Sequence, residues 1–254
     1  MTDITPRFDA IVLAGGDSTG IDANQPVKGL LEVSGKPLVA WVVDALKRAQ
    51  TIARIVVVIP ANTDRGSWAE GVTIVEHEGS LLENCESALE AVDGVRPLIW
   101  MSADIPAVTP AAIDDYTQRA TRRRAELTYP LILESDINKA FPGSVRTYMR
   151  ISEGRMTGGN LFTCTLEVAN KVRPIVSGFI DARKDPMAMV RLLGAGVATK
   201  FALGTLSISD VERRIHKLYG INAAGIITPF VEIGVDVDKP ADVAPMEAFL
   251  AQRR

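Results

Sequence analysis

The first half of the chain alternates short apolar runs with segments of helical periodicity, and this alternation limits the possible folds more than any other feature. The run at 10–13 stops at Gly15 and Gly16, where a turn is expected. Pro37 opens a segment in which apolar residues recur with the spacing of an amphipathic helix. Because helical crossovers join parallel strands, we expect a mostly parallel sheet. The predicted strands are 10–13, 54–59, 72–75 and 97–101, and the predicted helices are 37–49, 81–92 and 109–125.

The second half is less regular. The sequence from Ser209 to Glu212 fits a capping box, and Gly220 would close the short helix that it begins. We find no internal repeat and no clear linker, so we expect one domain over residues 1–254, with halves of about 1–125 and 126–254. The predicted strands of the second half are 127–133, 145–151, 224–227 and 232–237, and its predicted helices are 175–182, 186–200, 209–220 and 240–252.

Composition excludes several classes of protein. With 47% hydrophobic and 23% charged residues the chain has the composition of a folded domain. Its 28 basic and 31 acidic residues leave a net charge of -3, which argues against nucleic acid as a partner. Cys85 and Cys164 lack the spacing of a disulfide framework or a zinc site, and the N-terminus is unlike a secretory signal. We therefore expect a cytoplasmic protein.

The longest weakly charged stretch of the chain runs from 187 to 208. Arg191, Lys200 and three glycines interrupt it, so it falls short of a membrane span. Burial in the core is the default interpretation of this stretch. The wall of an acceptor pocket and the interface of a homodimer are the alternatives.

A glycine-rich loop follows the first predicted strand. Gly15 and Gly16 would let backbone amides approach an anion, and Lys28 would add a positive charge. The P-loop and dinucleotide-binding patterns both fail on spacing. Residues 16–20 match the G-x-S-x-G nucleophile elbow around Ser18, but no helix follows them directly. A serine hydrolase is therefore disfavoured, and it would also need His216 and an acid as partners.

Two acidic segments follow predicted strands. Asp104 lies just after the strand at 97–101, and Mg²⁺ prefers one or two carboxylates together with substrate oxygens. Asp236 and Asp238 are two residues apart, so on a strand they would point to one face. At a turn, only one of them could reach the site. Taken singly, each acid is more often a helix cap than a metal ligand.

Together these segments resemble the MobA-like nucleotidyltransferases over nearly the whole chain. The resemblance implies a three-layer, Rossmann-like α/β fold of the GT-A type, with a mixed, mostly parallel sheet and helices on both faces. It also implies that the chain binds a nucleoside triphosphate and Mg²⁺. The matching segments, in order, are Leu13-Ala14-Gly15-Gly16, Lys28, Val33–Leu38, Asp104–Pro106 and Val237–Asp242.

The resemblance implies roles for individual residues. Lys28, Asp104 and Asp238 would be catalytic, with Asp104 and Asp238 as metal ligands and Asp236 as the alternate. The first half would bind the nucleotide, and the second half would bind the acceptor and supply the second metal acid. The residues implied in nucleotide binding are Leu13, Ala14, Gly15, Gly16, Lys28, Gly79 and Ser80, and those implied in acceptor binding are Gly158, Gly159 and Asn160.

The chain departs from the family pattern in one respect. Family members commonly carry an arginine in the loop after the first strand, where this chain reads Asp17-Ser18-Thr19-Gly20-Ile21. Loss of a charge-assisted phosphate contact weakens binding by about 1.5 to 3 kcal/mol, so another cation is expected to compensate. The candidates by composition are Arg146, Arg155, Arg183 and Lys184.

The expected activity is the Mg²⁺-dependent transfer of a nucleoside monophosphate from a nucleoside triphosphate to a phosphorylated small-molecule acceptor, with release of pyrophosphate. The acceptor would be a sugar phosphate or a cofactor precursor. Two alternatives stay open: a glycosyltransferase of the GT-A type that uses a nucleotide sugar, and a catalytically weak nucleotide-binding protein. The sequence does not indicate which base is preferred.

Overall fold

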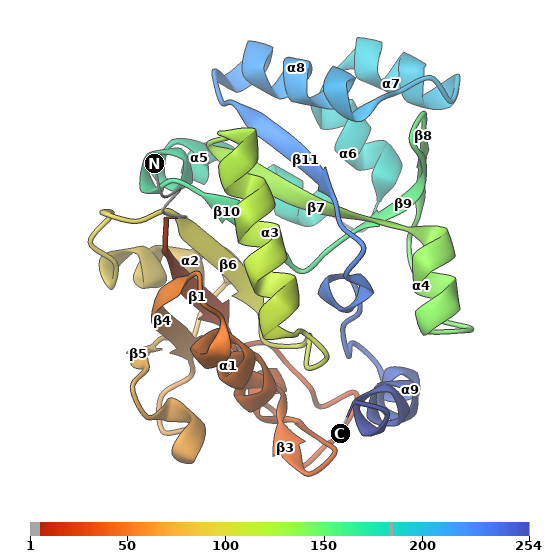
Figure 1. The fold of residues 1–254 in the computed structure, drawn as a ribbon. Coiled ribbons are helices and arrows are strands. Elements are labelled where there is room, and N and C mark those ends of the chain that lie inside the picture. The colour runs from red at the N-terminus through yellow and green to blue at the C-terminus, as the bar shows by residue number, and fades with distance from the viewer. Residues whose placement is uncertain (1–5, 183–184, 254) are drawn as a thin grey trace.

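The computed structural model describes residues 6–182 and 185–253, and its central element is a nine-stranded sheet (Figure 1). The strands of this sheet are β1 (Phe8–Leu13), β4 (Ile52–Ile59), β5 (Thr73–Glu76), β6 (Leu98–Ser102), β7 (Leu127–Leu133), β8 (Met149–Ile151), β9 (Gly154–Gly158), β10 (Leu161–Cys164) and β11 (Ala223–Ile227). They lie in the order β5-β4-β1-β6-β10-β7-β9-β8, with β11 beside β7.

The sheet is mixed. β1 pairs in parallel with β4 and β6, β4 with β5, and β7 with β11. The antiparallel pairs are β6 with β10, β7 with β10 and β9, and β8 with β9, so each includes a strand from the second half of the chain. A separate hairpin joins β2 (Glu32–Val33) to β3 (Lys36–Pro37) through Ser34 and Gly35, which both have positive φ, as the tight hairpin turn requires.

Helices cover both faces of the sheet. The α-helices are α1 (Leu38–Arg48), α2 (Leu81–Glu90), α3 (Pro110–Arg123), α4 (Glu134–Ala140), α5 (Leu166–Ala182), α6 (Pro186–Leu192), α7 (Ala195–Ala202), α8 (Ile208–Tyr219) and α9 (Pro240–Ala251). Along β1, Ala10 and Val12 pack with residues of α1 and α3, whereas Ile11 packs with residues of α2 and α5. A strand buried on both faces must be apolar throughout, so the continuous apolar runs are explained. The predicted α/β fold class is confirmed.

The apolar stretch at 187–208 contributes to the core. Val190, Leu193, Val197 and Leu206 are buried against strands β7, β8 and β9. The single helix predicted at 186–200 is wrong, because Gly194 takes a positive φ of 97° and separates α6 from α7. None of the helices in 6–182 and 185–253 is long and apolar enough to cross a membrane.

Three other predicted elements in the second half differ from the structure. The strand predicted at 232–237 is a short 3-10 helix, η3 (Val231–Ile233), followed by irregular chain whose apolar side chains are buried outside any sheet. The strand predicted at 145–151 is reduced to β8. The helix predicted at 175–182 is longer than expected, since α5 begins at Leu166. It continues through Pro174, a residue that normally ends a helix.

The helix predicted at 209–220 forms with a different start. Ser207 is the N-cap of α8: its hydroxyl accepts from Asp210 N at 3.1 Å, and Ser207 N donates to the Asp210 carboxylate at 3.1 Å. The capping box predicted from Ser209 to Glu212 is therefore wrong by two residues. Starting at Ile208 turns an apolar face of α8 toward the sheet. The end of the helix at Gly220, with φ of 60°, is as predicted.

Candidate active site

The chain leaves β1 as a loop and returns beside it at Lys28. Lys28 N donates to Gly16 O at 3.0 Å, and Gly29 N donates to Ala14 O at 3.1 Å. A Cβ atom on Gly29 would lie 2.4 Å from Ala14 O, so only glycine allows this approach. The return places Lys28 at the carboxyl end of β1, where open parallel sheets bind ligands.

The loop itself is held by its own side chains. Asp17 is exposed and accepts from both Thr19 N and Thr19 Oγ1 at 2.9 Å, and these bonds hold the pKa of Asp17 below its usual value. Ser18 is buried, and its hydroxyl donates to the Gln25 carbonyl. Ser18 thus stabilises the loop, a role that does not favour a hydrolase nucleophile.

The glycines of the loop leave donors for a ligand. Of the backbone hydrogen bonds in the described part of the chain, none is donated by Gly15 or Gly16. Gly16 has a φ of 90°, a conformation that other residues rarely adopt. The two amides therefore suit the anion contact predicted for them.

Asp104 lies in the loop after β6, directly beside the end of β1. Ala103 N donates to Leu13 O at 3.1 Å, and Val237 N donates to Asp104 O at 2.9 Å. These two bonds join the ends of β1 and β6 to the segment that carries Asp236 and Asp238. Backbone contacts thus bring the two distant acidic segments together.

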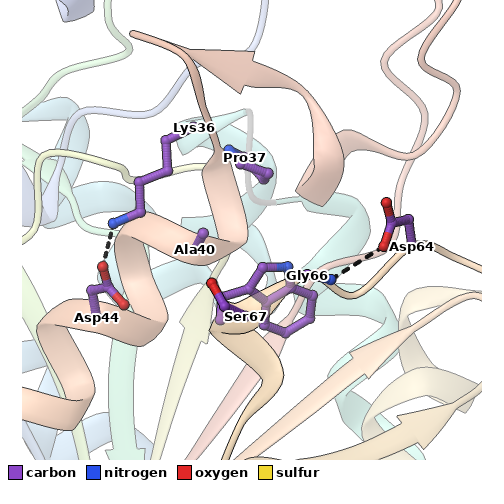
Figure 2. A pocket seen from close by; sticks show the side chains of 8 residues that line it. Lys36, Pro37, Ala40, Asp44, Asp64, Gly66 and Ser67 are labelled. Atoms are coloured by element: carbon purple, nitrogen blue, oxygen red, sulfur yellow. Dashed lines mark hydrogen bonds and ion pairs between the residues drawn. The ribbon is translucent and has the colours of Figure 1, made fainter.

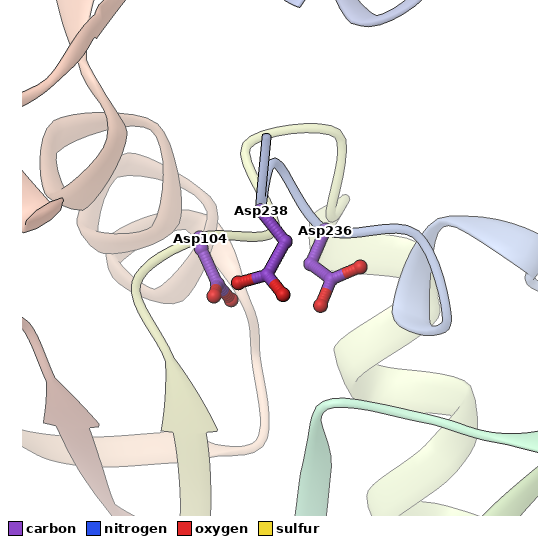
Figure 3. Close-up of side chains that lie close together, drawn as sticks. All are labelled: Asp104, Asp236 and Asp238. Atoms are coloured by element: carbon purple, nitrogen blue, oxygen red, sulfur yellow. The ribbon is translucent and has the colours of Figure 1, made fainter. Parts of the chain in front are cut away.

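Asp104, Asp236 and Asp238 form one acid cluster. One carboxylate oxygen from each lies within 4.8 Å of the others. Figure 3 shows the three side chains in a row, with Asp238 between Asp104 and Asp236. Both Asp236 and Asp238 therefore reach the site, although they lie on irregular chain and not on the strand predicted there.

Lys28 bridges two members of the acid cluster. Its Nζ lies 2.6 Å from Asp104 Oδ2 and 2.6 Å from Asp238 Oδ1. Burial opposes the charge on Lys28, but the two carboxylates outweigh burial, so the pKa of the ammonium lies above its usual value. The three residues predicted to be catalytic thus lie in direct contact.

The Asp104 side chain is the most buried of the cluster, with 12% of its surface exposed. Its Oδ1 atom is buried and has no hydrogen-bond partner among the described residues. Burial raises the pKa of Asp104, and the negative charge of Asp236 adds to that rise, while Lys28 opposes it. An unpaired buried carboxylate oxygen beside two further carboxylates suits an oxygen-preferring divalent cation.

Of the four cations considered as substitutes for the missing loop arginine, Arg146 reaches the cluster. Its guanidinium donates to the Asp236 carboxylate and, at 3.2 Å, to Asp236 O. Arg155 instead pairs with Glu134 at 2.7 Å. Arg183 and Lys184 lie outside the described residues.

The predicted nucleotide-binding turn at Gly79 and Ser80 lies near the glycine loop. Asn84, on α2, connects the two: its Nδ2 donates to Gly79 O at 3.2 Å and would lie 3.7 Å from a Cβ on Gly15. His77 Nδ1 is 2.8 Å from Asn84 Oδ1 and orients the amide. Asn84 and His77 are close to the glycine loop only because of how α2 packs, which local sequence patterns do not indicate.

The predicted acceptor segment Gly158-Gly159-Asn160 lies beside the end of β6. Asn160 O accepts from Ser102 N at 3.0 Å. A Cβ on Gly158 would lie 2.3 Å from the Tyr129 hydroxyl, and one on Gly159 would lie 2.7 Å from Ile233 Cγ2. Packing alone therefore requires these two glycines, and their role in acceptor binding stays a prediction.

A separate hollow of about 390 Å³ lies between α1 and the 3-10 helix η2 (Ser67–Ala69). Lys36 pairs with Asp44 in it, and Gly66 N donates to Asp64 at 3.2 Å (Figure 2). None of the residues predicted for the active site lines this hollow. Its lining residues are Lys36, Pro37, Ala40, Asp44, Asp64, Gly66, Ser67 and Trp68.

Comparisons with known proteins agree with this geometry. A family model of the MobA-like NTP transferase domain matches residues 10–142. A solved structure of a hypothetical transferase from Thermus thermophilus is 35% identical, with a TM-score of 0.81, and the match covers 93% of this chain and 99% of that chain. No curated protein sequence matches the chain.

Two more distant structures share the fold. CMP:2-keto-3-deoxy-manno-octonic acid synthetase complexed with CTP is 16% identical, with a TM-score of 0.58, over 98% of this chain and 100% of that chain. The 2-C-methyl-D-erythritol 4-phosphate cytidylyltransferase of Thermus thermophilus is 14% identical, with a TM-score of 0.53, over 95% and 98%. At these identities the two structures support the fold alone.

Proposed function

Because the chain belongs to the MobA-like NTP transferase domain family and is thereby a nucleotidyltransferase, we propose that it transfers a nucleoside monophosphate group to a phosphorylated small molecule. The donor is a nucleoside triphosphate, the reaction depends on Mg²⁺, and pyrophosphate is released. The acceptor is a sugar phosphate or a cofactor precursor. One structural neighbour is a 2-C-methyl-D-erythritol 4-phosphate cytidylyltransferase, and its name includes a phosphorylated small molecule of this class.

The observation that carries the proposal is the acid cluster beside the glycine loop. Asp104 and Asp238 would hold the metal, with Asp236 as the alternate. The unpaired Oδ1 of Asp104 and the all-oxygen set of donors fit Mg²⁺, which binds through carboxylates and substrate phosphates. When bound, the metal would neutralise charge on the α-phosphate and act as a Lewis acid.

The protein's own groups would position and neutralise the reactants. The amides of Gly15 and Gly16 would approach the phosphates, and the ammonium of Lys28 would stabilise charge that builds up on the departing pyrophosphate. The buried Asp104 has little freedom to reorganise. Catalysis of this kind depends mainly on positioning.

The bonding changes are simple. An oxygen of the acceptor phosphate forms a bond to the α-phosphorus, and the bond from that phosphorus to the oxygen bridging to the β-phosphorus breaks. Pyrophosphate leaves with the bonding electron pair. Because the attacking phosphate is already an anion, the reaction needs no general base.

The first test is a thermal-shift screen of ATP, GTP, CTP, UTP and dTTP, each with Mg²⁺ and with a chelator. A triphosphate that binds the folded protein raises its melting temperature by mass action, and we expect this rise to depend on Mg²⁺. If none of the five stabilises the protein, the proposed function is wrong.

The second test uses the selected triphosphate with a panel of phosphorylated acceptors. We expect pyrophosphate as a product. Release of a nucleoside diphosphate from a nucleotide sugar would instead identify a glycosyltransferase. Tight nucleotide binding without turnover across the panel would identify a catalytically weak nucleotide-binding protein.

A further inference from the structure

Arg146 lies at the opposite end of the acid cluster from Lys28. Lys28 contacts Asp104 and Asp238, whereas Arg146 contacts Asp236, which Figure 3 shows at the other end of the row from Asp104. Lys28 comes from the loop after β1, on the nucleotide side of the proposed site. Arg146 comes from the chain between α4 and β8, in the half predicted to bind the acceptor.

The guanidinium of Arg146 keeps donors for a ligand. Its Nε donates to Ser144 Oγ at 3.4 Å, and among the described residues its two terminal nitrogens each donate one hydrogen bond to Asp236. A guanidinium carries five N–H groups, so two remain after these contacts. Only 13% of the side chain is exposed, which strengthens any charged contact that it makes.

Tyr148, two residues further on, supplies a second donor. Its hydroxyl oxygen is buried and has no hydrogen-bond partner among the described residues. Leaving a buried hydroxyl unpaired is unfavourable, and a ligand oxygen that accepts its hydrogen bond would offset that cost. Tyr148 lies in the field of one anion, Glu134, and of two cations, Arg146 and Arg155, and the Arg155 guanidinium lies 5.9 Å from the ring centroid.

Arg146 and Tyr148 also connect the acid cluster with the predicted acceptor segment. Tyr148 directly precedes β8, in which Met149 pairs with Met156 of β9. Two residues after Met156, β9 ends at Gly158, where the predicted acceptor segment begins. The chain that carries Arg146 and Tyr148 and the predicted acceptor segment therefore adjoin the same pair of strands, β8 and β9.

We propose that Arg146 and Tyr148 bind the phosphate group of the acceptor beside the acid cluster. This inference rests on the proposed function and deepens it, because it assigns the residues that recognise the acceptor's anionic group. Held by the guanidinium and the hydroxyl, the acceptor phosphate keeps a further oxygen free to attack the α-phosphorus. A neutral acceptor would leave the Tyr148 hydroxyl and the two remaining N–H groups of Arg146 without an anionic partner.

The test measures phosphate binding directly. Inorganic phosphate is titrated calorimetrically into the protein saturated with Mg²⁺ and the α,β-methylene analogue of the triphosphate selected above, which cannot react. Acetate is titrated in parallel, to separate a phosphate site from a general carboxylate site. The variants are Arg146→Ala, Arg146→Lys and Tyr148→Phe, with Arg150→Ala as the control, because Arg150 is an exposed arginine on the neighbouring strand β8.

We expect Arg146→Ala to weaken phosphate binding at least tenfold and Tyr148→Phe to weaken it several-fold. Arg146→Lys should be intermediate, since it keeps the charge without the planar donors. Arg150→Ala should match the wild type, and the affinity for the nucleotide analogue should stay the same in Tyr148→Phe. If Arg146→Ala does not fold, the two conservative variants decide the matter.

Three results would overturn the proposal: unchanged phosphate affinity in both Arg146→Lys and Tyr148→Phe, equal binding of acetate and phosphate, or an equal loss of phosphate and nucleotide affinity. The last result would assign Arg146 to the triphosphate. If no triphosphate binds, the proposed function fails by itself. The titration of the nucleotide-free protein with phosphate then decides whether the two residues form an anion site.

Discussion

At the scale of single residues, the approach of Gly29 to Ala14 determines where Lys28 lies. Because a Cβ on Gly29 would meet Ala14 O at 2.4 Å, we expect Gly29→Ala to destabilise the protein by about 1 to 3 kcal/mol. Gly20→Ala in the same loop is the matched control, since nothing lies within 4 Å of its Cβ position. Chemical denaturation measures both. Equal stabilities would show that the return of the loop does not depend on this contact.

The role of Asp104 is also a question about one residue. Asp104→Asn removes a charge from the most buried position of the cluster, and we expect pyrophosphate release to fall by about 100-fold or more. Asp44→Asn is the control, because Asp44 pairs with Lys36 in the separate hollow of Figure 2. Unchanged release by Asp104→Asn, or an equal loss in both variants, would contradict the assignment.

At the scale of elements, the start of α8 distinguishes two overlapping capping patterns. Ser207 caps the helix in the structure, whereas Ser209 is exposed. We expect Ser207→Ala to lower the free energy of unfolding by about 1 kcal/mol, and Ser209→Ala to change it by less than about 0.5 kcal/mol. Urea denaturation of the two variants tests this. If Ser209→Ala destabilised the protein more than Ser207→Ala, the capping box predicted from Ser209 to Glu212 would be correct.

The same cap predicts a dependence of stability on pH. Hydrogen bonds from Lys200 and Ser207 hold the pKa of Asp210 below its usual value of 3.8. A carboxyl with a lowered pKa stabilises the folded state above its unfolded pKa, and this contribution is lost as the pH falls below that value. We therefore expect the wild type to melt above Asp210→Asn at pH 7 and the difference to shrink below about pH 4. A difference that is constant with pH would contradict the ion-pair explanation.

At the scale of the whole molecule, the acid cluster joins the two ends of the chain. Lys28 and Asp238 are 210 residues apart in the sequence and in direct contact. The single-domain organisation, the cytoplasmic location and the homodimer alternative stay predictions. The site residues stay predictions as to their roles, although the structure brings Lys28, Asp104 and Asp238 together.

The balance of charge in the cluster predicts how the molecule responds to metal removal. Lys28 and Arg146 already pair with the three carboxylates, so the fold does not need a cation to hold the cluster together. We expect a chelator to leave the melting temperature of the nucleotide-free protein unchanged and to abolish the stabilisation by a triphosphate. A large drop in the nucleotide-free protein would instead identify a structural metal.

The amino-acid sequence was enough to predict the β-α order of the first half and the strand ends that carry Gly15 and Asp104, because local periodicity and turn chemistry act over a few residues. The family was expected from a resemblance of several motifs in order, and the family model and the 35% identical structure show it. Three features became visible only in the folded chain: Asp236 joins the cluster, Arg146 contacts Asp236 from 90 residues away, and 231–237 forms a short 3-10 helix and irregular chain where a strand was predicted. Such contacts depend on how distant segments pack, and an apolar pattern indicates burial without indicating what lies opposite.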